Sequence, residues 1–394
     1  MRSQSWNEVR ARRLARHHLT APAARGELID VVRAVCGLHA QVMASAELSA
    51  GLRVDGLTRA DLAAALWERR SLVKMYGIRG TVHIFPADEF ALWAAALSTL
   101  PRGDDDRRLA YLGLTRAQLA AIVDAIVGAV EERRRTREEI GAAVARRVGA
   151  WTVERTVSAF GGRWSVWQAG LGAAATDGRI CFGPNEGARV TFESARRWLG
   201  PQRAVDPEDA LREVFRRYLR AYGPATHAHF AQWFRLPTSR ARDIAESLGD
   251  EIEQVEVDGA RLLQLRGDRA ARPKRVTLLI PRFDPYVVGS HPREVLVPAA
   301  SVERFRSSGI VPARARSGRE FLVGPTPTLL VDGAITGIWE QRRARGTLEI
   351  RVQAFTRLRS DDRDAIAESA ARIGAVLETD VRVSFGAIST RPHL

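Results

Sequence analysis

Hydrophobic residues along this chain recur at helical spacing over several segments and then alternate with polar ones, and this succession of patterns occurs repeatedly. In its first occurrence, a helix is indicated by apolar positions at Leu28, Val31, Val35 and Leu38. Thr58 and Asp61 have the spacing of a capping box and predict the start of another helix. Residues 72–85 then alternate, which predicts a β-hairpin with its turn at Gly77.

The second strand of this hairpin is predicted to carry a polar face. Alternate side chains on a strand point to opposite sides, so Arg79, Thr81 and His83 lie together on one face. Two interpretations remain open. Either these side chains hold a phosphate or part of a substrate, or the strand is structural and Arg79 pairs with a carboxylate such as Asp88 or Glu89.

The same succession recurs twice further along the chain. The second occurrence predicts helices over residues 119–130, after Thr136 and over 164–171, with a short strand pair turned at Asp177-Gly178. The third predicts helices over 210–222, 227–233 and 239–248, and a hairpin that joins 252–257 to 260–265 through Asp258-Gly259. Helices followed by a hairpin are the order of a winged helix, so each occurrence is interpreted as one such domain.

After a linker at residues 266–275, the chain becomes rich in predicted strands. Strands are predicted over 276–280, 329–331, 334–339 and 347–354, and a closing helix over 361–377. The predicted fold is mainly α with β wings. It consists of tandem winged-helix (helix-turn-helix) domains at 1–105, 106–200 and 201–270 and a strand-rich α+β C-terminal domain at 271–394.

A basic hairpin is predicted between two of the C-terminal strands. Its turn carries Arg342, Arg343 and Arg345, close to Trp339. Such a hairpin can enter a groove of a nucleic acid or hold phosphates, and the alternative is a solvated turn. The functional interpretation is favoured because the protection of a sheet edge requires fewer charges.

The charge of the chain favours a nucleic-acid partner. Arginine and lysine number 60 against 46 aspartate and glutamate residues, which gives a net charge of +14, and only Lys74 and Lys274 are lysines. The guanidinium group suits phosphates and base edges, although an arginine-rich proteome produces the same composition.

The separated Cys36 and Cys181 form neither a zinc motif nor a disulfide framework. With no signal peptide and no apolar segment of membrane-spanning length, the chain is expected in the cytoplasm.

The strongest candidate for chemistry is the segment Gly37-Leu38-His39-Ala40-Gln41. If the backbone after Gly37 is extended, His39 and Gln41 point to the same side and can share one water molecule, whereas on a helix they diverge. A neutral histidine can also accept a proton from that water. The structural alternative is a hydrogen-bonded histidine at a helix end, followed by an ordinary polar residue.

Several other residues also have a functional and a structural interpretation. Asp284 and Arg293 flank a loop that either reaches a functional site or contains an internal ion pair. His227 and His229 point to different faces of a helix, which argues against joint metal binding. The predicted core tryptophans are Trp164, Trp167 and Trp233.

Six strings follow one another along the chain: Gly37 to Gln41, Ser71 to Val73, Ile78 to His83, Tyr218 to Thr226, Phe283 to Tyr286 with Arg293, and Val331 to Gly333 with Gly337-x-Trp339. In this order they resemble the AlkZ/YcaQ-like winged-helix DNA glycosylases, over almost the whole chain. The resemblance implies a tandem of winged helices that forms a curved, basic surface for double-stranded DNA. It also implies excision of alkylated purines, in particular of bulky lesions and crosslinks at guanine N7. No metal or cofactor is implied, and the family often serves self-protection against DNA-damaging natural products.

The resemblance assigns catalysis to positions 39 and 41, where the family usually carries Gln-x-Gln or Gln-x-Asp. Here the first position is His39 and the second retains Gln41. An N7-alkylated purine is cationic and leaves without a general acid, so the remaining task is to hold a water against the sugar as oxocarbenium character grows. The predicted DNA- or lesion-binding residues are Arg79, Thr81, His83, Asp284, Arg293, Trp339, Arg342, Arg343 and Arg345.

Two functions from different classes fit these features. The first is a monofunctional DNA glycosylase (an N-glycosyl hydrolase), expected as a monomer associated with the nucleoid, whose substrate is double-stranded DNA with N7- or N3-alkylated purines. The second is a non-catalytic winged-helix DNA-binding protein, either a transcription regulator or a protein that shields lesions. Three winged helices in tandem suit a wrap around one site and favour the enzyme.

Overall fold

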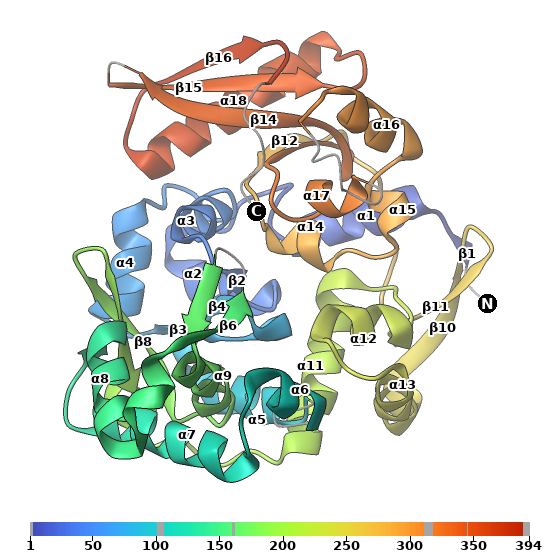
Figure 1. Ribbon diagram of the computed structural model, residues 1–394. Helices are drawn as coiled ribbons and strands as arrows, with labels where there is room; N and C mark the ends of the chain where they lie inside the picture. Colours follow the sequence, from blue (N-terminus) through green and yellow to red (C-terminus); the bar gives the residue numbers. More distant parts are fainter. Residues whose placement is uncertain (1–2, 101–105, 160–161, 311–317, 345, 389–394) are drawn as a thin grey trace. The chain divides into compact units, whose positions relative to one another are not determined.

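The computed structural model describes residues 3–100, 106–159, 162–310, 318–344 and 346–388. The chain forms two compact units. The first consists of Met1–Ala63, Phe215–Trp233 and Ala241–Leu394, and the second of Ala64–Val214 and Phe234–Arg240. Over its described residues the chain is mainly helical, with a strand-rich sheet in its C-terminal part (Figure 1).

The C-terminal sheet organises the first unit. Its strands follow the order β12 (Thr277–Ile280), β13 (Thr328–Val331), β14 (Ala334–Ala344), β15 (Thr347–Ala354) and β16 (Val381–Phe385). Neighbours are antiparallel except β15 and β16, which run parallel and are joined through α18 (Ser360–Leu377). Helix α18 lies across one face of this sheet (Figure 1), where Ile366 and Ile373 share a core with Leu279 and Ile350. The predicted strands and closing helix are confirmed, whereas β16 was not predicted.

The N-terminal segment of the chain belongs to the same core. It contains α1 (Trp6–Arg16), α2 (Leu28–Ala34), β2 (Leu38–His39) and α3 (Met43–Gly51). Leu48 and Leu52 pack into the core of the C-terminal sheet. Helix α3 also approaches α18 closely at Gly51, where a Cβ atom would collide with the side chain of Val376. Leu14 and Leu19 also pack in this core, and residues 1–63 group with the C-terminal sheet in the first unit.

Four short helices connect β12 to β13. They are α14 (Pro285–Gly289), α15 (Arg293–Leu296), α16 (Ala299–Ser307) and α17 (Arg319–Leu322). Helix α14 starts with Asp284, whose carboxylate accepts a hydrogen bond from the backbone N–H of Tyr286. The predictions did not include these helices, because each is too short to produce a periodic pattern.

The third predicted succession of helices and hairpin is confirmed element by element. It comprises α11 (Pro207–Tyr222), α12 (His227–Phe234), α13 (Thr238–Ser247), β10 (Ile252–Val257) and β11 (Ala260–Leu265). The hairpin turn has φ of 44° at Asp258 and 82° at Gly259, as a two-residue turn of the primed type requires. Strand β1 (Ser3–Gln4) extends this hairpin in parallel to β10.

Burial lowers the pKa of His229, on α12, from 6.5 to about 4, and its Nδ1 accepts a hydrogen bond from the Thr226 N–H. The unfolded chain therefore binds a proton near pH 6.5 that the folded chain binds only near pH 4. Between these values we expect the free energy of unfolding to fall as the pH is lowered. In urea denaturation across this window, His229→Gln should show a smaller decrease than the wild type. An identical decrease in both proteins would contradict the assignment.

The second unit contains mostly helices and short antiparallel strand pairs. Its elements are α4 (Arg59–Trp67), which begins in the first unit, β3 (Leu72–Tyr76), β4 (Val82–Pro86), α5 (Phe90–Ser98), α6 (Asp106–Leu112), α7 (Arg116–Glu131), β5 (Arg135–Thr136), α8 (Arg137–Val148), β6 (Arg155–Ala159), β7 (Gly162–Ser165), α9 (Ala169–Thr176), β8 (Ile180–Glu186), β9 (Arg189–Ser194) and α10 (Ala195–Leu199). Strands β5, β9 and β8 form one antiparallel sheet in that order.

The prediction of a helix over residues 164–171 is wrong. Residues 162–165 form strand β7, which pairs with β6, and the helix begins only at Ala169. As a consequence Trp164 is 47% exposed and is not a core residue. Trp167 and Trp233 are both 3% exposed, which confirms that part of the prediction.

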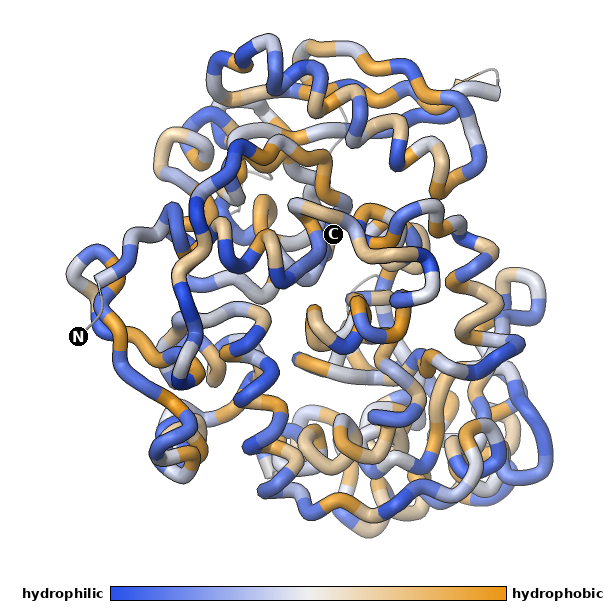
Figure 2. The backbone as a smooth tube through the Cα atoms, turned by 180° about the vertical axis from the view of Figure 1, so that it is seen from behind, coloured by the Kyte–Doolittle hydropathy of each residue, from blue (hydrophilic) through white to orange (hydrophobic). Residues whose placement is uncertain are grey.

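Hydrophobic and hydrophilic stretches are interspersed along the backbone (Figure 2). Among the described residues, no helix combines the length and the apolar character needed to cross a membrane. Cys36 and Cys181 are both buried, and no disulfide occurs in the described part of the chain.

Candidate functional site

A tight turn after α2 sets the conformation of the predicted catalytic segment. Cys36 and Gly37 both have positive φ, 61° and 90°. The Gly37 N–H closes the helix by donating to the carbonyl of Val32 at 2.9 Å. The chain leaves this turn as the two-residue strand β2, so His39 lies on an extended backbone, and Gln41 follows in a bend.

His39 and Gln41 differ in their exposure. His39 is 7% exposed, and its ring stacks on Phe283 with centroids 4.8 Å apart and planes at 20°. Gln41 is exposed and directly precedes the turn into α3. The arrangement therefore combines an imidazole fixed by an aromatic ring with a carboxamide at the surface.

A buried ion pair holds the segment that carries Phe283. The two guanidinium nitrogens of Arg53 donate to the two carboxylate oxygens of Asp284 at 2.8 and 2.7 Å, and both side chains are fully buried. The Ser49 hydroxyl donates to the same carboxylate at 2.8 Å. Since Ser49 and Asp284 anchor α3 to the start of α14, they fix Phe283 relative to the helix that follows Gln41.

Phe283 itself has a backbone conformation that is rare for an aromatic residue. Its φ is 58°, in the left-handed region. Its N–H donates to the carbonyl of Gly324 at 2.8 Å, and Asp284 next to it is tied to Arg53. Backbone strain of this kind persists where the surroundings determine it, and such positions concentrate at functional sites.

The structure gives Asp284, Arg293 and Trp339 structural contacts, in place of the direct contacts with DNA that were predicted. Asp284 is fully buried in its pair with Arg53 and not with Arg293. The guanidinium of Arg293 donates to the carbonyls of Val287, Val288 and Ser290 at the end of α14. Trp339 is 2% exposed, and its indole N–H donates to the Ile280 carbonyl at 2.9 Å.

The predicted polar face of the 72–85 hairpin is not a continuous strand face. Residues 78–80 form a 3₁₀ turn in which Arg79 has φ of 59°, and β4 starts only at Val82. The Thr81 hydroxyl donates to the Ile78 carbonyl at 3.0 Å. His83 is 4% exposed and stacks on Phe85. These residues belong to the second unit, whereas His39 and Gln41 belong to the first.

The arginine-tipped hairpin is confirmed as the connection between β14 and β15. Arg342 is opposite Glu349 in register and forms an ion pair with it at 3.1 Å, with the Arg342 side chain 78% exposed. Arg343 is also exposed, and Arg345 lies outside the described residues. An exposed ion pair of this kind contributes little to stability, so Arg342 can exchange its partner for a phosphate at small cost.

A cavity of about 140 Å³ in the first unit borders the segment that follows Gln41. Val42 and Ser45 of the α3 region form part of its wall, together with Arg282, Thr326 and Trp339. Trp339 therefore lines an internal space beside the candidate catalytic segment, although it does not reach the surface.

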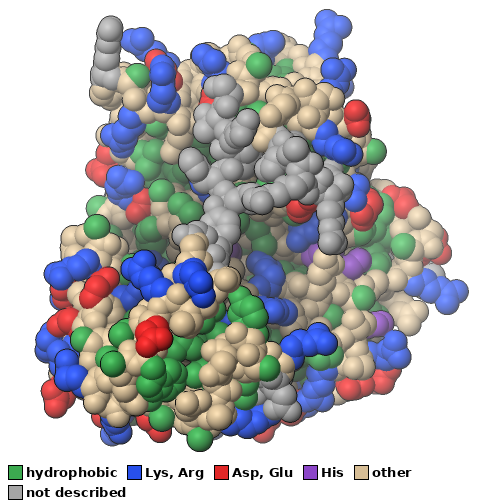
Figure 3. All heavy atoms as spheres, viewed as in Figure 1, with side chains coloured by type: hydrophobic (Ala, Val, Ile, Leu, Met, Phe, Trp, Pro, Cys, Tyr) green, Lys and Arg blue, Asp and Glu red, His purple; other side chains and the backbone are tan. Residues whose placement is uncertain are grey.

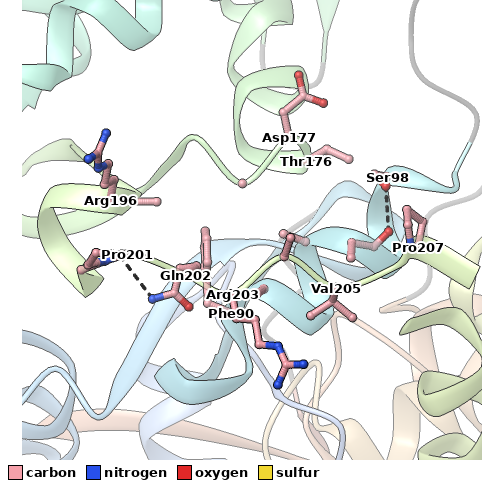
Figure 4. Close-up of a pocket in the computed structure, with 17 residues that line it drawn as sticks. Phe90, Ser98, Thr176, Asp177, Arg196, Pro201, Gln202, Arg203, Val205 and Pro207 are labelled. Carbon is pink, nitrogen blue, oxygen red and sulfur yellow. Dashed lines mark hydrogen bonds between the residues drawn. The ribbon is translucent and has the colours of Figure 1, made fainter. Parts of the chain in front are cut away.

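A second cavity, of about 700 Å³, lies within the second unit between α5 and the segment that follows α10. Its charged residues include Asp177, Arg196 and Arg203, whose charged groups point in different directions (Figure 4). Binding and catalytic sites usually contain a few convergent polar groups. This cavity is therefore a weaker candidate for chemistry than the segment around His39.

The charge of the surface is largely arginine, and many arginines have carboxylate partners. Lys and Arg side chains are spread over the face seen in Figure 3, with Asp and Glu side chains among them. Ion pairs such as Arg25–Asp61 and Arg16–Asp268 account for part of this pattern. No group of three or more His, Cys, Asp or Glu side chains with metal-binding geometry occurs in the described part of the chain.

Sequence reasoning missed three residues of this site: Ser49, Arg53 and Phe283. A signal for two of them exists, because Ser49 and Arg53 place polar side chains four positions apart in a mostly apolar helical segment. Their partner Asp284 is 231 residues away from Arg53, and no local pattern reveals that pairing.

Comparison with known proteins places this geometry in a family. The profile of the family described as "DNA glycosylase AlkZ-like" matches residues 32–376. The chain is 28% identical over 347 residues to an "Interstrand DNA cross-link repair glycosylase" from Streptomyces sahachiroi, covering 85% of this chain and 88% of that protein.

A solved structure gives the same result. The DNA glycosylase AlkZ of Streptomyces sahachiroi superposes with a TM-score of 0.77 at 25% sequence identity, over 98% of this chain and 100% of the other. The matched residues include the His39-x-Gln41 segment, the Arg53–Asp284 pair and strands β12 to β15 of the C-terminal sheet. The chain therefore belongs to the AlkZ-like DNA glycosylase family.

Proposed function

We propose that this DNA glycosylase removes N7- or N3-alkylated purines from double-stranded DNA, including bulky adducts and interstrand crosslinks, by positioning a water molecule with His39 and Gln41. The observation that carries the proposal is that His39, at the end of strand β2, stacks on Phe283 while Gln41, two residues later, is exposed. The relative that repairs interstrand crosslinks supports the bulky class of substrate.

The chemistry needs few groups because the substrate is already activated. Alkylation at N7 or N3 makes the purine cationic, so the base leaves without protonation by the enzyme. What remains is to orient a water toward the sugar as positive charge develops there. The Gln41 carboxamide can hold that water through its oxygen, and the neutral imidazole of His39 can take its proton.

Stacking on Phe283 gives the imidazole a fixed orientation, and orientation is what a water-positioning residue must supply. The ring of Phe283 also removes solvent from one face of the imidazole. Protonated His39 would place a cation next to the developing charge of the sugar, so the proposed mechanism uses the neutral form.

The arrangement of helices and strands supports DNA binding through winged helices. In the second unit the order α7, β5, α8, α9, β8, β9, with β6 and β7 inserted after α8 and the sheet order β5–β9–β8, supports a winged-helix interpretation, and α11 to β11 follow a similar order. We interpret these as tandem modules on which a monomer binds duplex DNA. Arg79, Arg342, Arg343 and Arg345 remain the proposed contacts with DNA.

Excision is tested directly with DNA that contains N7-methylguanine or a bulkier N7 adduct. The expected result is release of the modified base and formation of abasic sites by the wild-type protein, with no release of unmodified guanine. A wild type that binds this DNA but releases no adduct would instead support a non-catalytic protein that shields lesions.

Binding is expected to weaken steeply with salt, because each phosphate that the protein neutralises releases condensed counterions. Each such contact adds about 0.9 to the slope of log affinity against log salt concentration. Fluorescence anisotropy with labelled duplex measures this slope, and Arg343→Ala should lower it by about one contact. A slope that is unchanged in this variant would show that Arg343 of the hairpin does not contact a DNA phosphate.

A further inference from the structure

The hairpin of β6 and β7 interrupts the connection between α8 and α9 and carries exposed aromatic and basic side chains. A groove of about 630 Å³ lies between this hairpin and α8. Its floor is formed by Trp167, which is 3% exposed and packs against Gly141 of α8. In Figure 1 the hairpin extends away from α7 and α8.

Exposed apolar side chains concentrate at this hairpin. Only four large hydrophobic residues of the described chain are strongly exposed, and two of them, Val153 at 40% and Trp164 at 47%, line the groove. A third, Tyr111 at 56%, donates its hydroxyl hydrogen bond to the Ser158 carbonyl on β6. Exposed hydrophobic side chains that gather in one place mark a binding surface.

The basic residues of the groove have no acidic partners. Arg137, Arg155 and Arg163 line it, and none of them forms an ion pair with the described residues. The acidic residue of the lining is Glu138. Elsewhere in the chain many arginines are paired with carboxylates, so this cluster keeps its positive charge available for a polyanion.

One hydrogen bond holds Arg163 at the hairpin without neutralising its charge. The Arg163 guanidinium donates to the Thr156 carbonyl across the hairpin at 3.0 Å. The Nε of Arg137 is buried and has no hydrogen-bond partner in the described part of the chain. The Arg163 guanidinium is therefore held at the groove by a neutral contact, and its charge remains for a ligand.

We propose that this groove binds a single DNA strand, with Trp164 stacked on an unpaired base and Arg137, Arg155 and Arg163 on its phosphates. Aromatic side chains stack on bases only where the bases are unpaired, whereas arginines hold the backbone. The groove has the volume of a small-ligand site, which suits one nucleotide. The inference rests on the proposed function only in taking DNA as the ligand.

The test measures binding of the full-length protein to a labelled single strand and to the matched duplex by anisotropy. Trp164→Ala is expected to weaken single-strand binding about tenfold, since stacking on one base contributes that much. Trp164→Phe should retain most of the affinity because it keeps an aromatic face. Duplex binding should be little changed in both variants.

Charge is tested separately. Arg155→Ala and Arg163→Ala should each lower the salt slope for the single strand by about 0.7. The matched control is Arg146→Ala, which removes the same charge from the last turn of α8, outside the groove. The proposal is overturned if Trp164→Ala binds the single strand like the wild type, or if Arg146→Ala weakens it as much as Arg163→Ala.

The outcome of these single-strand binding tests does not depend on catalysis. His39→Ala should bind the single strand normally although it fails to excise bases. If the wild type releases no modified base while Trp164→Ala still loses single-strand binding, the proposed function fails and the groove assignment stands.

Discussion

Replacement of His39 by alanine is expected to slow release of an N7-alkylated purine by about 10² to 10⁴, the range that a positioned general base contributes. Both the proton acceptor and the ring that stacks on Phe283 are lost in this variant. Single-turnover excision from adducted duplex measures the rate of the chemical step, and anisotropy shows whether DNA binding is retained. Loss of excision with intact binding is the predicted combination.

The matched variant is His39→Gln, which restores the Gln-x-Gln pattern that the resemblance implies for the family. It should remain active, because a carboxamide can still orient the water. Its rate should be independent of pH, whereas that of the wild type should fall at acidic pH, because a protonated imidazole can no longer accept a proton from the water. A pH-independent wild type would show that His39 only positions the water.

Disruption of the Arg53–Asp284 pair is expected to have the largest effect on stability. Arg53→Met leaves the carboxylate of Asp284 buried without its cation, and breaking such a pair costs about 3–5 kcal/mol. Urea denaturation followed by tryptophan fluorescence measures the loss. Because Asp284 also starts α14 next to Phe283, any folded Asp284→Asn protein should excise bases more slowly.

Two variants control for this result. Arg25→Ala removes an exposed partner of Asp61, a pair that contributes at most about 1 kcal/mol. The double variant Arg53→Met with Asp284→Leu should recover part of the lost stability, since no unpaired charge remains buried. If Arg53→Met destabilises the protein no more than Arg25→Ala does, the pair does not hold the site together.

Local patterns were sufficient to predict much of the fold. The hairpin around Asp258-Gly259 could be predicted because its turn requires positive φ at both residues, which the sequence encodes directly. The strand at residues 162–165 could not be predicted, since Trp164 and Trp167 have the spacing of a helix and fit that structure equally well. Its pairing with β6 decides the outcome.

In the candidate site, too, local sequence predicts some features, whereas others depend on partners distant in the chain. The extended backbone at His39 follows from Gly37 and was foreseen as one of two geometries. The roles of Asp284 and Trp339 could not be predicted, because each depends on a partner distant in sequence. Asp284 pairs with Arg53, and Trp339 donates to the Ile280 carbonyl. Charge and aromatic character alone do not distinguish a buried residue from one that contacts DNA.

The central claim is that His39 and Gln41 act as one unit on a single water molecule. The most direct measurement compares the single-turnover excision rates of His39→Ala, Gln41→Ala and the double variant on the same N7-adducted duplex. Residues that act as a unit are strongly non-additive, so the double variant should be about as slow as the slower single variant. The claim is contradicted if the rate losses of the two single variants multiply in the double variant, or if the single variants are as fast as the wild type.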